Sequence, residues 1–168
     1  MPEITLDMIK RLREQTGAGV MDCKRALERS DGDHDKATAY LTELGIASAA
    51  KKASREASQG LVESYIHAGR IGAIVEVNCE TDFVARTEPF KELAHNLAMQ
   101  IVAANPTVVN EDELPESFEG LPTEHVLMLQ PYIKDPAKNI RQLINETIGK
   151  TGENIQVRRF RRFELGVE

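Results

Sequence analysis

Apolar residues recur at helical spacing in three short segments at the start of the chain, and a glycine follows each segment. Thr5 and Asp33 carry the oxygen atoms that cap the first turn of a helix, and Gly17 and Gly45 stand where two of the helices should end. The inner faces of the segments comprise Ile9 and Leu12, then Val20, Cys23 and Leu27, and finally Ala37, Tyr40, Leu41 and Leu44. This pattern predicts a three-helix domain over residues 1–45.

Residues 46–59 are rich in alanine, serine and lysine. Ile46 and several of the alanines keep helical spacing, but side chains this small bury little apolar surface. We therefore expect a partly helical tether between two modules, and we place the start of the second module at residue 60.

From Gly60 onward the hydrophobic period changes from that of a helix to that of a strand. The segments 61–67 and 71–79 are rich in valine, isoleucine and tyrosine, and three residues with a central glycine separate them. This arrangement predicts a β-hairpin. Residues 154–165 read as a final strand, which we expect beside the hairpin in a three-stranded antiparallel sheet.

Two amphipathic helices are predicted to pack on this sheet. The first runs from Thr87 to Ala104, and Asn105-Pro106 ends it. The second opens at Asp135-Pro136 and closes at Gly149 and Gly152. The predicted fold class is α+β: a three-helix domain, a tether, and a small antiparallel sheet packed on helices over residues 60–168.

The net charge of −6 is concentrated in one part of the chain. Residues 107–125 contain six carboxylates, no lysine or arginine, two prolines and no sustained hydrophobic period, which predicts an exposed acidic loop. The rest of the chain is close to neutral, so the overall acidity argues only weakly against a polyanionic partner.

Composition also bears on location and redox chemistry. No apolar run approaches the length of a membrane span, and the first residues lack the apolar core of a signal peptide, so we expect a cytoplasmic protein without a membrane partner. Cys23 and Cys79 are too few and too far apart for a disulfide framework or a zinc site. Both are expected to be small buried hydrophobic residues.

The hexapeptide Thr81–Arg86 places a large aromatic residue, Phe83, between a carboxylate and an arginine at a turn from strand to helix. Phe83 could fold back onto the core, as most phenylalanines do. It could instead be presented as a wedge to another molecule, because turn positions face solvent and often carry function. Residue type alone leaves both interpretations open.

Four ordered motifs favour the second interpretation. They are LREQTGAGVMDCKRAL at 12–27, EVNCETDFVAR at 76–86, QPYIKDP at 130–136 and GENIQVRRF at 152–160. Together they resemble the signatures of the elongation factor Ts family, and four motifs in order are far more specific than one. The resemblance implies a translation factor that binds elongation factor Tu carrying GDP and promotes GDP release. It implies no covalent chemistry, no catalytic residue, no metal site and no cofactor.

The same resemblance implies roles for seven residues and a fold for the first domain, which would be of the ubiquitin-associated type. Val20, Met21 and Lys24 would meet a helix of the partner's GTPase domain. Asp82 and Phe83 would enter beside the nucleotide, within a loop from Thr81 to Val84 associated with loss of the partner's Mg²⁺. The segment between Pro106 and Pro131 is short for the family, so the chain resembles the family's compact form. This resemblance leads us to expect a homodimer.

Three other functions fit parts of the chain. Four arginines interleave with aromatic residues in a strand that could bind RNA, namely Arg158, Arg159, Arg161 and Arg162 with Phe160 and Phe163, but no RNA-binding motif accompanies them, so direct nucleic-acid binding is not expected. His34, His67, His95 and His125 lack metal-ligand spacing, and His95 is expected at the surface, so a metal enzyme or hydrolase is disfavoured. An adaptor built on residues 1–45 would leave the second module unexplained.

Overall fold

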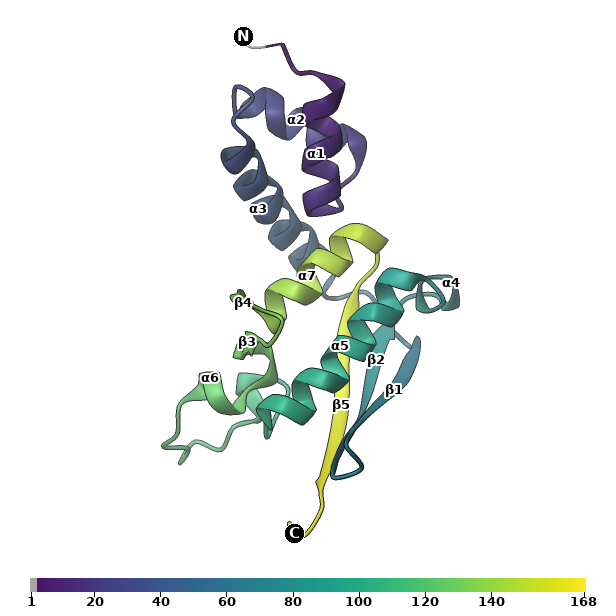
Figure 1. Ribbon diagram of the computed structural model, residues 1–168, viewed down its shortest axis with the longest axis vertical. Coiled ribbons are helices and arrows are strands. Elements are labelled where there is room, and N and C mark those ends of the chain that lie inside the picture. The colour runs from purple at the N-terminus through teal and green to yellow at the C-terminus, as the bar shows by residue number, and fades with distance from the viewer. Residues whose placement is uncertain (1–2) are drawn as a thin grey trace.

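The computed structural model describes residues 3–168 and contains two packed bodies joined by one long helix (Figure 1). The first body holds α1 (Leu6–Thr16), α2 (Val20–Arg29) and the start of α3 (His34–Lys52). The second holds β1 (Gln59–His67), β2 (Ile71–Cys79), α4 (Asp82–Ala85), α5 (Glu88–Ala104), α6 (Pro122–His125), β3 (Pro131–Tyr132), β4 (Asp135–Asn139), α7 (Ile140–Thr151) and β5 (Ile155–Glu164). The α+β class predicted from the hydrophobic periods is confirmed.

The three-helix unit forms through the predicted caps. The Thr5 hydroxyl accepts a hydrogen bond from the Met8 amide at 3.3 Å, and the Asp33 carboxylate accepts one from the Lys36 amide at 3.0 Å. Gly17 ends α1 in the left-handed conformation. The core of the unit is made of Ile9, Leu12, Cys23, Ala26, Leu27, Ala37 and Leu41.

The predicted end of α3 at Gly45 is wrong, because the helix continues to Lys52. The alanines after Gly45 favour helix, and Ala49 is buried within the core of the second body. The end of α1 also lies against the second body, since a side chain at Gly17 would collide with the aliphatic part of Lys150 on α7. The non-helical part of the predicted tether is thus confined to residues 53–58.

The three-stranded antiparallel sheet is present as predicted, and the structure shows that the last strand pairs with β2, in the order β1-β2-β5. Its alternation places Val75, Val77 and Cys79 of β2 toward α5 and α7, which cover one face (Figure 1). Gly60 permits the closest approach of β1 to β2, because a Cβ atom there would overlap the Val77 carbonyl oxygen.

The predicted start of the last helix at Asp135-Pro136 is also wrong. Residues 135–139 form β4, which pairs with β3, and α7 begins at Ile140. A capping box decides the boundary: the Asn139 side chain accepts from the Gln142 amide at 2.9 Å, and the Gln142 side chain accepts from the Asn139 amide at 2.8 Å. The helix passes through Gly149 and ends at Gly152, which adopts the left-handed conformation.

The acidic segment 107–125 is mostly exposed, as expected, with one 3₁₀ turn at Glu111–Glu113 and the single turn α6. It is anchored at its start, where Val109 is buried and Val108 bridges to Val126. Within residues 3–168 no helix has the combination of length and apolar character needed to cross a membrane.

Both cysteines are free and buried, one in each hydrophobic core, which confirms the predicted packing role.

The two cysteines provide a test of the predicted division of the chain at residues 45 and 60. In a variant that keeps only Cys23, we expect an aromatic disulfide reagent to label the thiol faster than in a variant that keeps only Cys79, because the three-helix unit buries less apolar surface and opens more often. Cys79→Ala leaves Cys23 as the single thiol, and Cys23→Ala leaves Cys79. Equal labelling rates across a range of urea concentrations would mean that the two bodies unfold together.

Candidate functional site

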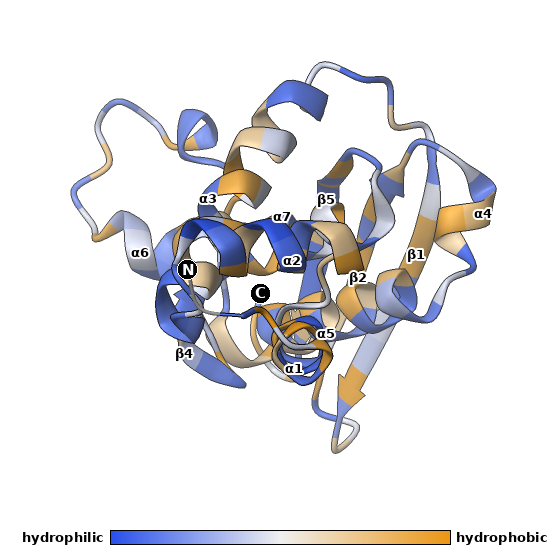
Figure 2. Ribbon diagram, turned by 90° about the horizontal axis from the view of Figure 1, so that it is seen from above, coloured by the Kyte–Doolittle hydropathy of each residue, from blue (hydrophilic) through white to orange (hydrophobic). Residues whose placement is uncertain are grey.

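The turn that follows β2 presents Phe83 to solvent. Thr81 caps the short helix α4, with its hydroxyl accepting a hydrogen bond from the Val84 amide at 3.3 Å. Ala85 is buried at the other end of the turn, while Phe83 is 76% exposed. Figure 2 shows α4 as a hydrophobic segment at the periphery of the second body. The interpretation in which Phe83 folds back onto the core is therefore wrong.

Thr81 and Val84 hold this turn together rather than facing outward. The Glu153 carboxylate accepts hydrogen bonds from the Thr81 amide at 2.9 Å and from its hydroxyl at 2.7 Å. The Val84 carbonyl accepts from the Thr87 hydroxyl at 2.7 Å, at the junction with α5. Of the four loop residues expected at the site, Asp82 and Phe83 are thus the two that project into solvent.

Asp82 is half exposed and forms a salt bridge of 3.0 Å with Arg86, one helical turn later. An exposed pair of this kind contributes little to folding, about 0.3–0.5 kcal/mol. The carboxylate therefore remains free to exchange Arg86 for another partner. A flat aromatic ring and an exposed carboxylate stand next to each other on one turn.

The second group of expected site residues lies on the outer face of α2. Cys23, Ala26 and Leu27 anchor the inner face of this helix, so the opposite side is turned to solvent. Val20, the first residue of α2, is 49% exposed, so its predicted place on the inner face is wrong, and Met21 is 63% exposed. Lys24 follows Val20 by one turn, and its ammonium lies 3.8 Å from a Glu28 carboxylate oxygen. The structure brings Val20, Met21 and Lys24 together into one apolar patch with a cationic edge, which we call the α2 patch.

The α2 patch and the α4 turn belong to different bodies of the molecule (Figure 1). The structure does not merge them into a single site. A partner that contacted both would have to reach across the region where α3 packs against α7. The expected site residues thus form two separate exposed groups on one chain.

The polar cluster that sequence analysis missed lies at the base of the α4 turn. Glu80 and Glu153 each bind backbone amides across the end of the sheet, and Asn154 lies between them. More than seventy residues separate the two carboxylates along the chain. No local pattern could have paired them, although Glu153 does directly follow the glycine that ends α7.

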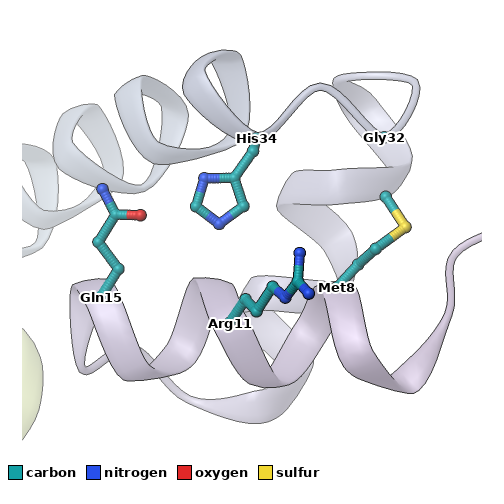
Figure 3. Close-up of a pocket in the computed structure, with 5 residues that line it drawn as sticks. All are labelled: Met8, Arg11, Gln15, Gly32 and His34. Carbon is teal, nitrogen blue, oxygen red and sulfur yellow. The ribbon is translucent and has the colours of Figure 1, made fainter.

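Features that would support an enzyme are weak. Burial, followed by the negative charge of Glu153, raises the pKa of the Cys79 thiol to about 11, so it stays protonated and donates to the Thr81 carbonyl at 3.1 Å. A shallow pocket between α1 and the start of α3 is lined by Met8, Arg11, Gln15, Gly32 and His34 (Figure 3). Within residues 3–168 no cluster of three potential metal ligands occurs, and His95 is exposed, as expected.

Of the four arginines of β5, Arg162 is held within the molecule, whereas the other three are exposed and two of them lie beside a carboxylate. Arg162 donates through two guanidinium nitrogens to the Val102 carbonyl, both at 3.2 Å, at the C-terminal end of α5. Arg158 and Arg159 lie 3.7 and 3.3 Å from the Glu76 carboxylate. These contacts reduce the positive charge that a nucleic acid would meet on this strand.

Comparison with known proteins identifies relatives along nearly the whole chain. The family model for Elongation factor TS matches residues 34–120. The chain is 50% identical to Elongation factor Ts of Heliobacterium modesticaldum, in an alignment covering 97% of this chain and 90% of the relative. It is 46% identical to Elongation factor Ts of Thermotoga neapolitana, covering 99% of each chain. These alignments span 194 and 196 residues, more than the 168 of this chain, so the relatives carry segments without a counterpart here.

The opposite environments of two phenylalanines give a test of the site geometry. Phe83→Ala should change the free energy of unfolding by less than about 0.5 kcal/mol, because the ring makes few contacts with the folded chain. Phe90→Ala is the comparison, because Phe90 on α5 is fully buried; this substitution should lower the free energy of unfolding by about 3–5 kcal/mol. Urea titrations followed by circular dichroism measure both. A large loss in Phe83→Ala would show that the ring packs on the core in solution.

Proposed function

This chain belongs to the elongation factor Ts family, and is thus a translation elongation factor; on that premise we propose that it binds elongation factor Tu carrying GDP and promotes release of the nucleotide. The factor acts by binding and makes or breaks no covalent bond. The observation that supports this most strongly is the exposed Phe83 on a turn whose base is held by hydrogen bonds. We further propose that the factor works in the cytoplasm, with its partner.

Exchange requires the factor to compete with nucleotide for the partner. GDP is held by a phosphate-binding loop and by Mg²⁺, through interactions that depend steeply on distance. If the exchange factor binds the nucleotide-free partner more tightly than the loaded one, it lowers the affinity of the partner for GDP. By the same ratio, returning nucleotide lowers the affinity of the partner for the exchange factor. The chemistry needed is a rigid insertion close to the phosphates, with no reacting group.

Phe83 and Asp82 suit that insertion. Burying an exposed phenylalanine in a partner pocket yields about 1.5–3 kcal/mol, and the ring has few internal degrees of freedom to lose. The Asp82 carboxylate, next to it, introduces negative charge where phosphate and Mg²⁺ ligands would lie. Thr81 and Val84 complete the loop by fixing its backbone.

The α2 patch supplies the second contact. Val20 and Met21 present apolar side chains that adapt to a helix groove, and Lys24 adds a cation at the edge. We propose that this patch contacts a helix of the partner's GTPase domain and supplies affinity, whereas the α4 turn disturbs the nucleotide site. This division of roles predicts different kinetic effects for the two groups.

We also propose that the chain forms a homodimer through the open face of its sheet. Val62, Ile66, Ile74 and Phe163 are exposed on the face opposite α5 and α7. Glu76 and Arg159 are paired across neighbouring strands of the same face, so a second copy would meet both charges at once. An apolar face rimmed by both charge signs is self-complementary, as a two-fold interface requires.

Release of a fluorescent GDP analogue from purified elongation factor Tu tests the function. Wild type should speed release manyfold. Phe83→Ala should lower the maximal rate roughly 10–100-fold, since about 1.5–3 kcal/mol of insertion energy is lost. Met21→Ala should instead raise the concentration needed for half-maximal release.

Excess Mg²⁺ should oppose the wild-type effect if the metal site is the one disturbed. Leu121→Ala, an exposed apolar residue in the acidic segment, is the matched control and should behave as wild type. If wild type leaves release unchanged, the exchange function is refuted. If Phe83→Ala matches wild type, the α4 turn is not the element that disturbs the nucleotide site.

The dimer is tested at the centre of the open face. Ile74→Arg should weaken self-association roughly tenfold or more, because a charge would enter an apolar interface, while Leu121→Arg should leave it unchanged. Sedimentation velocity from one to one hundred micromolar distinguishes the two. A wild-type chain that stays monomeric throughout this range would contradict the dimer.

A further inference from the structure

One corner of the second body carries a set of hydrogen bonds that begins where sheet pairing ends. The last paired residues of β2 and β5 are Cys79 and Ile155. Beyond this pair, a carboxylate in each of the two neighbouring segments accepts a hydrogen bond from a backbone amide of the other segment. Glu153 accepts from the Thr81 amide at 2.9 Å, and Glu80 accepts from the Asn154 amide at 2.7 Å.

The segment that follows α3 and leads from the three-helix unit into the sheet passes the same corner. The Asn154 side chain is 2% exposed and donates to the Arg55 carbonyl at 2.8 Å, just beyond α3. Arg55 returns a salt bridge of 3.6 Å to the carboxylate of Glu80. We call Glu80, Glu153 and Asn154 the corner cluster. It contacts both the α4 turn and the segment that leaves α3.

We propose that Glu153 is a positioning residue for exchange: through Thr81 it holds the α4 turn, and thereby Phe83, in the orientation that enters the partner. Within the corner cluster, Glu80 and Asn154 fix that turn relative to the end of α3. The distance between Phe83 and the α2 patch is thereby set before the partner binds. This inference rests on the proposed exchange function.

The physical reason is that α4 cannot hold its own shape. A helix of four residues is far shorter than a stable isolated helix, so its geometry must come from tertiary contacts. Its inner contacts are the small side chain of Ala85 and the partly buried side chain of Val84. The two hydrogen bonds from Thr81 to Glu153 have an ionised acceptor, which makes them roughly twice as strong as neutral ones. An insertion element whose base is loose would pay an ordering cost at each encounter.

Three variants on the full chain separate positioning from simple folding. Glu153→Ala removes both acceptors of the Thr81 bonds, whereas Glu153→Gln keeps the shape and one carbonyl acceptor. Glu146→Gln is the matched control, since it changes an exposed carboxylate on α7, the helix that ends just before Glu153, and this carboxylate binds Lys138 at 2.9 Å. Glu153→Ala should lower the maximal GDP release rate roughly tenfold with little change in the half-saturating concentration, Glu153→Gln should recover most of the rate, and Glu146→Gln should match wild type.

Hydrogen exchange on the free chain supplies a readout that does not depend on the partner. In Glu153→Ala the amides of residues 81–85 should exchange at least about tenfold faster, while those in the centre of β2 keep their protection. Should Glu153→Ala lose cooperative unfolding, the pair Thr81→Ser and Thr81→Val tests the hold on the turn at its other end: serine retains the hydroxyl that donates to Glu153 and caps the Val84 amide, and valine loses both.

The outcomes discriminate between the inference and its premise. Faster exchange of the turn with a lowered maximal rate supports positioning by Glu153. Faster exchange of the turn with a wild-type rate overturns it, and so does unchanged exchange of the turn. If the wild-type chain itself does not release GDP, the exchange function fails, and the hydrogen-exchange result then reports only whether Glu153 holds the turn.

Discussion

Burial of one face of a three-stranded sheet beneath two helices is the constraint on which the rest of this structure depends. So small a sheet is stable only when a face is covered, and α5 and α7 together provide that cover. Phe90, Leu97 and Ile101 of α5 and Ile144 and Ile148 of α7 supply much of the contact. Because both helices use the same face, the opposite face stays exposed to solvent together with its apolar side chains.

Antiparallel pairing then gathers distant segments at one corner. The start of β1, the end of β2 and the start of β5 lie side by side, since Gln59 pairs with Cys79 and Cys79 pairs with Ile155. The segment leaving α3, the α4 turn and the end of α7 must therefore meet there. Polar groups at this meeting point bind backbone amides that the sheet leaves unpaired, which explains why carboxylates stand beside an apolar core.

Local patterns predicted most elements, and failed where a tertiary contact outweighed a local signal. Gly45 carries the usual mark of a helix end, yet α3 continues because Ala49 is buried in the second core. Asp135-Pro136 resembles a helix start, yet the segment pairs with β3, and the Gln100 side chain, fully buried, binds the Pro131 carbonyl and the Ile133 amide nearby. Such partners lie about thirty residues away and leave no periodic trace in the sequence.

The sequence by itself determined the caps that begin α1 and α3, the hydrophobic periods and the motifs that carry the family, because each depends on neighbours within a few residues. The resemblance to the family also pointed to Phe83, Asp82 and the residues of the α2 patch as the positions proposed to contact a partner. Only the tertiary structure decided that Phe83 points to solvent, that Thr81 turns inward to Glu153, and that the α2 patch and the α4 turn lie on separate bodies. The reason is physical: the direction of a side chain on a turn of four residues is set by contacts from elsewhere in the chain, which no local pattern records.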